Sequence, residues 1–187
     1  INNAEINMVK KRKIRCRLVV GLCLIAFMFS AHAQQTGNPT TYQLVENISY
    51  RAENKDDAYA TERCVLDVYY PENTEGFPTV VWFHGGGITG GEKFIPQELK
   101  EKGIAVVAVN YRLSPKVKAP TYIDDAAAAI AWTFKHIGEY GGDPHKIFIS
   151  GHSAGGYLVA MVGLDKSWLQ QYGEDADKLA GIIDFSG

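Results

Sequence analysis

The sequence predicts an α/β fold with a mostly parallel sheet that is led by antiparallel strands. Two observations carry this prediction. Four continuous apolar runs, typical of strands buried on both faces, alternate with segments of helical character. Before them, two segments alternate between apolar and polar residues, as half-exposed strands do. Strands that alternate with helices are joined by right-handed crossovers, which place the strands parallel in one sheet.

The expected elements follow in chain order. The alternating strands are 45–50 and 64–70, and the polar stretch 53–57 suits a hairpin connection between them. The four apolar runs are 79–83, 104–109, 147–150 and 181–186. Helical segments are expected at 95–102, which is short and amphipathic, at 123–136, at 154–164 and, as a single turn, at 175–179.

Residues 8–33 have the layout of a secretory signal peptide. A basic stretch after Met8 leads into an apolar run from Leu18 to Phe29, and Ala31-His32-Ala33 then forms an A-x-A cleavage pattern. The alternative, a membrane-spanning helix, is disfavoured because a span needs about 20 apolar residues. We therefore expect cleavage near Ala33, a secreted or periplasmic location and no stable membrane anchor.

The remainder divides into a flexible lead-in, 34–43, and one partial domain, 44–187. Six of the 19 basic and one of the 21 acidic residues precede Gln34, so 13 basic and 20 acidic residues follow, with a net charge of −7. This balance disfavours a nucleic-acid partner. Cys64 is the single cysteine after the leader and is expected to be a buried strand residue.

Ser153 is the candidate nucleophile. It stands in Gly151-His152-Ser153-Ala154-Gly155, between an apolar strand and a helical segment. A serine between glycines at such a turn is typical of a nucleophile elbow, where strained backbone exposes the hydroxyl and bulky neighbours would block the close approach of the chain. The alternative is a serine in an ordinary glycine-rich turn.

A second glycine-rich segment, His84-Gly85-Gly86-Gly87, follows another buried strand. Backbone N–H groups of Gly86, Gly87 and Ala154 are the candidate oxyanion donors, because glycines allow the backbone to approach a substrate closely. His84 is expected to support this loop through hydrogen bonding of its ring. The alternative is a mobile loop without a catalytic role.

A general base and its orienting acid are not identified. The five histidines include His32 in the leader and His84 in the loop, and none follows Ser153. The side chain of His152 is expected to point away from that of Ser153. His136 and His145 flank the N-terminal end of the strand before the elbow, whereas catalytic groups gather at the C-terminal ends of parallel strands. Asp184 is read as a mid-strand structural residue, and Asp124 and Asp125 as favourable charges at a helix start. No metal-ligand spacing is present, and no cofactor is expected.

At this point a resemblance is clear: the two glycine motifs resemble those of the α/β-hydrolase superfamily, in its hormone-sensitive-lipase-like and bacterial acetyl or feruloyl esterase-like branch. Further similar motifs are Asn110-Tyr111-Arg112-Leu113-Ser114-Pro115, Ala119-Pro120 with Asp125 and Trp132, and Gly142-Asp143-Pro144. The resemblance implies cofactor-free ester hydrolysis with Ser153 as nucleophile and Gly86, Gly87 and Ala154 as oxyanion donors. It also implies that the acid and histidine follow later strands, so the chain looks like the front portion of a longer protein. Ile88 departs from the aromatic residue that such esterases often carry after the glycine loop.

The leading hypothesis is a secreted serine carboxylesterase acting on a small acyl ester, such as an acetyl group on a carbohydrate. Two alternatives stay open: an acyl-peptide or amide hydrolase on the same fold, and a non-catalytic hydrolase-like binding module. Without its base, the chain by itself is expected to be inactive. The oligomeric state is not predicted.

Overall fold

The computed structural model describes residues 40–51 and 56–187. The expected signal peptide, 8–33, lies outside these residues, as does most of the expected lead-in. The first strand, β1 (Tyr42–Ser49), begins inside the segment 34–43 that was expected to be flexible, so that boundary was wrong by two residues. Tyr42 explains the difference, because its ring stacks on Tyr69 of the neighbouring strand with 4.9 Å between ring centroids.

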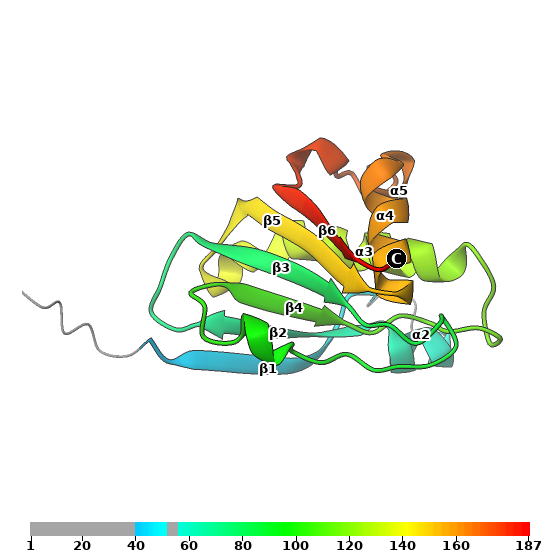
Figure 1. Ribbon diagram of the computed structural model, residues 1–187, viewed down its shortest axis with the longest axis horizontal. Coiled ribbons are helices and arrows are strands. Elements are labelled where there is room, and N and C mark those ends of the chain that lie inside the picture. Colours follow the sequence, from blue (N-terminus) through cyan, green and yellow to red (C-terminus); the bar gives the residue numbers. More distant parts are fainter. Residues whose placement is uncertain (1–39, 52–55) are drawn as a thin grey trace, which may run out of the picture. The chain divides into compact units, whose positions relative to one another are not determined.

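Six strands form one mixed sheet in the order β1-β2-β4-β3-β5-β6 (Figure 1). The strands after β1 are β2 (Val65–Pro71), β3 (Phe77–Phe83), β4 (Ala105–Val109), β5 (Gly142–His152) and β6 (Gly181–Phe185). β1 and β2 pair antiparallel, β2 is antiparallel to β4, and the remaining pairs are parallel. The predicted fold class, a mostly parallel sheet with antiparallel leading strands, is confirmed.

Two helices cover one face of the sheet. α3 (Thr121–His136) and α4 (Ala154–Leu164) pack against each other and against β3 and β5, and α3 lies behind the sheet in the view of Figure 1. Ala126 to Ala129 are buried against the strands because their small side chains allow a close approach. Both helices were predicted.

The shorter helices differ more from expectation. α2 (Ala58–Arg63) lies in the connection that was expected to be a plain hairpin, and Asp57 caps it by accepting hydrogen bonds from the N–H groups of Tyr59 and Ala60. Only the 3-10 turn η1 (Gln97–Leu99) forms within the helix expected at 95–102. The expected turn at 175–179 is η3 (Ala176–Lys178), while α5 (Ser167–Gln170) and η2 (Ile137–Tyr140) were not predicted.

The parallel register brings several strand ends to one edge of the sheet. Phe83 at the end of β3 pairs with Val109 of β4 and with Gly151 of β5, and Gly151 pairs with Asp184 of β6. The chain therefore leaves β3 at His84 and β5 at Ser153 side by side. Within the described residues, no helix has both the length and the apolar character needed to cross a membrane.

Candidate active site

Ser153 lies at a sharp turn between β5 and α4. Its backbone has φ 53° and ψ −116°, a conformation that L-residues adopt only when the surrounding structure holds them there. The flanking glycines explain how the turn fits. A Cβ atom on Gly151 would clash with the backbone of Gly155, and one on Gly155 would clash with the carbonyl of Phe83. The Ser153 N–H is also fixed, because it donates to the carbonyl of Phe185 at 2.8 Å.

The glycine loop lies directly against this turn. A Cβ atom on Gly85 would lie 3.0 Å from the carbonyl oxygen of His152 and 3.5 Å from Cβ of Ser153. Gly86 and Gly87 have φ of +118° and +62°, and a side chain on Gly86 would clash with the carbonyl of Gly90. Both positions favour glycine for their conformation, and Gly86 also requires it for space.

Three backbone N–H groups are available around Ser153. Those of Gly86, Gly87 and Ala154 donate no hydrogen bond to any residue that the structure describes. Ala154 is the first residue of α4, where the helix leaves its N–H without an internal partner. The structure thus brings the three predicted oxyanion donors and the predicted nucleophile together in one region. Such an arrangement can attack a carbonyl carbon and stabilise the charge that develops on its oxygen.

His84 is buried beneath the loop. Its Nδ1 lies 2.6 Å from the carbonyl oxygen of Gly85, and its ring stacks on Tyr111 with 4.5 Å between ring centroids. Burial lowers the pKa of the imidazole, which opposes the charged form. A neutral ring with its proton on Nδ1 donates to Gly85, and this geometry fits a supporting contact to the loop.

The other described histidines do not contact the Ser153 hydroxyl. His136 stacks on Trp132 and pairs with Glu139 through Nδ1 at 2.8 Å, and His145 lies in the N-terminal half of β5. The exposed His152 lines a cavity of about 500 Å³ together with Trp82, Phe94 and Phe185. The hydroxyl of Ser153 itself forms no hydrogen bond with the described residues, which therefore supply no base to it.

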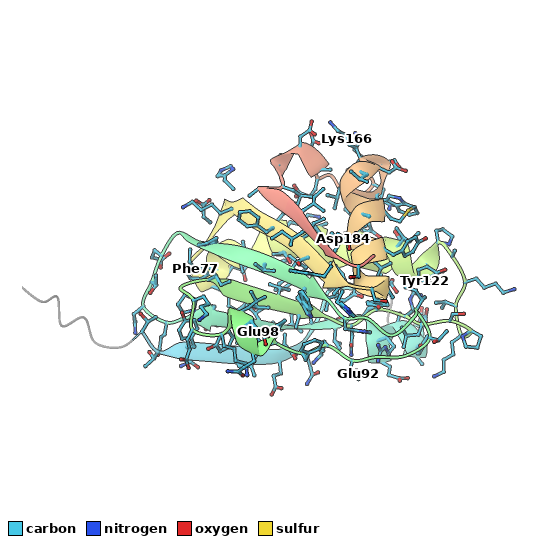
Figure 2. The ribbon with its side chains drawn as sticks, viewed as in Figure 1. Phe77, Glu92, Glu98, Tyr122, Lys166 and Asp184 are labelled. Atoms are coloured by element: carbon cyan, nitrogen blue, oxygen red, sulfur yellow. The ribbon has the colours of Figure 1, made fainter. Side chains whose placement is uncertain are left out.

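Two expectations about acidic residues were incomplete. Asp184 is the fourth of five residues in β6, so it lies at the C-terminal end rather than in the middle of the strand. Its carboxylate accepts the N–H of Gly187 at 2.9 Å beside α4 (Figure 2), which is a local backbone contact. Asp124 and Asp125 do more than favour the start of α3, because Asp125 is fully buried between two arginines and Asp124 pairs with one of them.

The side chains that contact the two ends of the glycine loop were not identified from the sequence. They belong to Arg63, Glu92, Asn110 and Tyr111. Asn110 and Tyr111 stand in a motif that was recognised, but no local pattern indicates Arg63, which reaches the loop only through the tertiary fold. In residues 40–51 and 56–187, no three His, Cys, Asp or Glu side chains gather closely enough to hold a metal ion.

The fold and the turn at Ser153 define the chain as an α/β hydrolase in architecture. A family model described as BD-FAE matches residues 66–187. The chain belongs to this family, which groups with hormone-sensitive-lipase-like α/β hydrolases.

Relatives of the chain are named lipases and carboxylic ester hydrolases. Lipase 2 of Moraxella sp. is 37% identical over 118 residues, which are 58% of this chain and 27% of the relative. The probable carboxylic ester hydrolase LipM of Mycobacterium tuberculosis is 42% identical over 92 residues, 46% of this chain and 21% of the relative. The chain therefore spans about a quarter of the length of these relatives.

Solved structures of esterases are also similar. A truncated carbohydrate esterase from gut microbiota has a TM-score of 0.60 and 26% identity, with 71% of this chain and 47% of that chain covered. A bacterial heroin esterase has a TM-score of 0.52 and 26% identity, with 76% of this chain and 44% of that chain covered. The chain thus matches slightly less than half of each of these esterases.

Proposed function

We propose that the protein is a serine carboxylesterase in which Ser153 is the nucleophile. One observation carries the proposal: Ser153 has a strained positive-φ backbone and lies against the glycine loop at Gly85, and the N–H groups of Gly86, Gly87 and Ala154 donate to no described residue. A serine in a packing role would not need this combination of strain and unpaired donors. The esterase names of its relatives and structural neighbours support the same reaction class.

In this mechanism, Oγ of Ser153 attacks the ester carbonyl carbon as a base removes its proton. The carbonyl oxygen becomes an oxyanion that accepts hydrogen bonds from Gly86, Gly87 and Ala154. The carbon–oxygen bond to the alcohol then breaks, the alcohol leaves with that proton, and an acyl-serine remains. Water then attacks the acyl carbon as the base removes one of its protons, and a second oxyanion forms at the same three N–H groups. Collapse of this oxyanion breaks the bond to Oγ, releases the carboxylic acid and passes the proton taken from water to Ser153.

We further propose that the base and its orienting acid follow Gly187 in the full polypeptide. The described residues offer no histidine to the Ser153 hydroxyl, and the relatives are about four times as long as their matched regions. The proposed substrate is a small acyl ester, such as an acetyl group on a carbohydrate, with no cofactor, metal or nucleic acid required. Similarity to a carbohydrate esterase supports this substrate class.

We also propose export from the cytoplasm, because residues 8–33 combine basic, apolar and A-x-A segments. A mature N-terminus at Gln34, measured by mass spectrometry of the protein expressed in its native host, is the expected result. A retained leader would contradict this proposal and leave the reaction mechanism untouched.

The reaction is tested with the full polypeptide that the gene encodes. We expect Ser153→Ala to lower the hydrolysis of p-nitrophenyl acetate by about 10³-fold or more, because the covalent route is removed. Ser150→Ala is a matched control, since the Ser150 hydroxyl bonds the carbonyl of Ile183 and lies three residues earlier in the chain. Equal activity of Ser153→Ala and the unchanged protein would refute the serine mechanism. Cleavage of aminoacyl p-nitroanilides instead of esters would indicate an amide hydrolase, and absence of both activities a binding module.

A further inference from the structure

Arg63 holds one end of the glycine loop. It is the last residue of α2 and is 5% exposed. Its Nη2 donates to the carbonyl oxygen of Gly91 at 3.1 Å, and its Nη1 forms an ion pair with Glu92. Glu92 lies beside α2 in Figure 2. The guanidinium is therefore bonded to two consecutive residues at the point where the loop ends.

The same guanidinium reaches the other end of the loop through Tyr111. Nε of Arg63 donates to the Tyr111 carbonyl at 3.1 Å, and the Tyr111 hydroxyl donates to the His84 carbonyl at 2.8 Å. The stacking of the Tyr111 and His84 rings adds a second contact at this end. One buried side chain thus connects the start and the end of the loop.

Asn110 completes this arrangement. Its Nδ2 donates to Glu92 at 2.7 Å, and its Oδ1 accepts the N–H of Lys93 at 2.6 Å. Both bonds hold the segment just after the loop.

The loop needs support of this kind because its own backbone is permissive. Five of the seven residues 85–91 are glycine, and glycine has more backbone conformations available than any other residue. Within the loop, the N–H groups of Thr89 and Gly90 both bond the Gly86 carbonyl at 3.1 Å. These bonds shape the turn, but its placement against Ser153 depends on where its two ends are fixed.

We propose that Arg63 is a positioning residue for the oxyanion donors. Its guanidinium fixes both ends of the loop, and this sets the direction of the Gly86 and Gly87 N–H groups toward the carbonyl that Ser153 attacks. The inference rests on the proposed esterase function and adds a residue outside the two glycine motifs. Lysine cannot replace it, because a single ammonium group lacks the planar set of donors that reaches Tyr111, Gly91 and Glu92 together.

The kinetic test compares Arg63→Lys with Arg51→Lys in the full polypeptide. Arg51 is a matched control, because it is also a buried, ion-paired arginine but contacts Asp124 and Asp125 instead of the loop. Displaced N–H groups of Gly86 and Gly87 would stabilise the oxyanion of the transition state less, while binding of the ester would change little. We therefore expect Arg63→Lys to lower kcat for p-nitrophenyl acetate by about 10- to 100-fold. KM should change less than about twofold, as uniform binding is kept. Arg51→Lys should lower the melting temperature and keep kcat.

A trifluoromethyl ketone gives a second readout, because its tetrahedral adduct with serine carries the oxyanion. Its inhibition constant should rise with Arg63→Lys by the same factor as kcat/KM falls. Glu92→Gln should show the same trend with a smaller change, and this variant guards against a folding failure of Arg63→Lys, since the Glu92 side chain is 72% exposed. The proposal would be overturned if the inhibition constant were unchanged and the decrease in kcat equalled the fraction of the variant that is unfolded.

Hydrogen exchange separates this inference from the proposed function. Amides of the peptide 85–92 should exchange faster in Arg63→Lys and Glu92→Gln than in Arg51→Lys or the unchanged protein. If the unchanged protein hydrolyses no ester, the proposed function fails while the exchange result still decides whether Arg63 holds the loop. If esters are hydrolysed but exchange and kcat are the same in all variants, the role of Arg63 is wrong.

Discussion

Among single residues, His84 combines a contact to the glycine loop with a lowered pKa. Burial is the main cause that lowers its pKa, and the charge of Arg63 acts in the same direction. Nε2 is buried and bonds to no described residue, so a proton there would be enclosed without an acceptor. Burial and the enclosed Nε2 therefore oppose the charged ring, while the bond from Nδ1 to the Gly85 carbonyl acts in the opposite direction and raises the pKa.

This makes stability depend on pH through His84. The folded pKa is lower than the unfolded value of about 6.5, so the unfolded chain binds the proton first as the pH falls. The free energy of unfolding should decrease below about pH 6.5 and level off once the pH passes below the folded pKa. Urea unfolding between pH 7.5 and 5 should show a shallower decrease in His84→Asn, whose amide can still donate to Gly85. Equal slopes in the two proteins would contradict this role.

Residues that satisfy a backbone requirement could be predicted from the sequence, and those that act across the fold could not. Gly86, Gly151 and Gly155 stand where a side chain would clash with nearby backbone, and this need is visible as a local motif. Arg63 bonds residues 28 and 48 positions away, so no pattern near it indicates the contacts. The roles of Ser153 and of the three oxyanion donors stay predictions until the kinetic variants are measured.

At the scale of elements, the position of α4 depends on Gly155. The first turn of this helix passes so close to the end of β3 that a methyl group on Gly155 would clash with the Phe83 carbonyl. Neither partner can yield easily, because one is helix backbone and the other is a strand bounded on both sides by neighbours. The close packing of β3, β5 and α4 is therefore what fixes the turn at Ser153.

Gly155→Ala should destabilise the fold through this contact. We expect a loss of about 1–3 kcal/mol or more in the free energy of urea unfolding, in the range of overpacked sites. Gly138→Ala is a matched control, because a Cβ atom there would meet no other group within 4 Å, and we expect a change within about 0.5 kcal/mol. Similar losses at the two positions would show that the close approach of α4 is unimportant.

Long elements were predictable because their patterns extend over several turns or residues. α3 and α4 show sustained helical character, and the central strands are uninterrupted apolar runs. α2 has six residues, too few for a periodic pattern, and its formation depends on the Asp57 cap. The helix expected at 95–102 forms only one 3-10 turn, Gln97–Leu99, and the backbone is extended again at Lys100 with ψ 142°.

At the scale of the whole molecule, a buried ionic cluster joins segments that are distant in the chain. Asp125 of α3 is fully buried and accepts two side-chain bonds from Arg112, at 2.9 and 2.7 Å. Arg51, after β1, pairs with the same carboxylate at 2.8 Å. Arg112 also pairs at 2.9 Å with Asp57, which caps α2. One carboxylate thus ties α3 to the segment after β1 and, through Arg112, to α2 and to the segment after β4.

Removing the charge of Asp125 should therefore weaken the fold as a whole. Asp125→Asn keeps the shape of the side chain but leaves two buried arginines without their shared carboxylate, and breaking a buried pair costs about 3–5 kcal/mol. Asp177→Asn is the matched control, because Asp177 forms an exposed pair with Lys166 that water and salt screen. Urea unfolding at low and moderate salt should show a large, nearly salt-independent loss for Asp125→Asn and a small change for Asp177→Asn. Equal small losses would mean that desolvation of the three charged groups offsets their attraction, and that apolar packing of α3 alone holds these segments together.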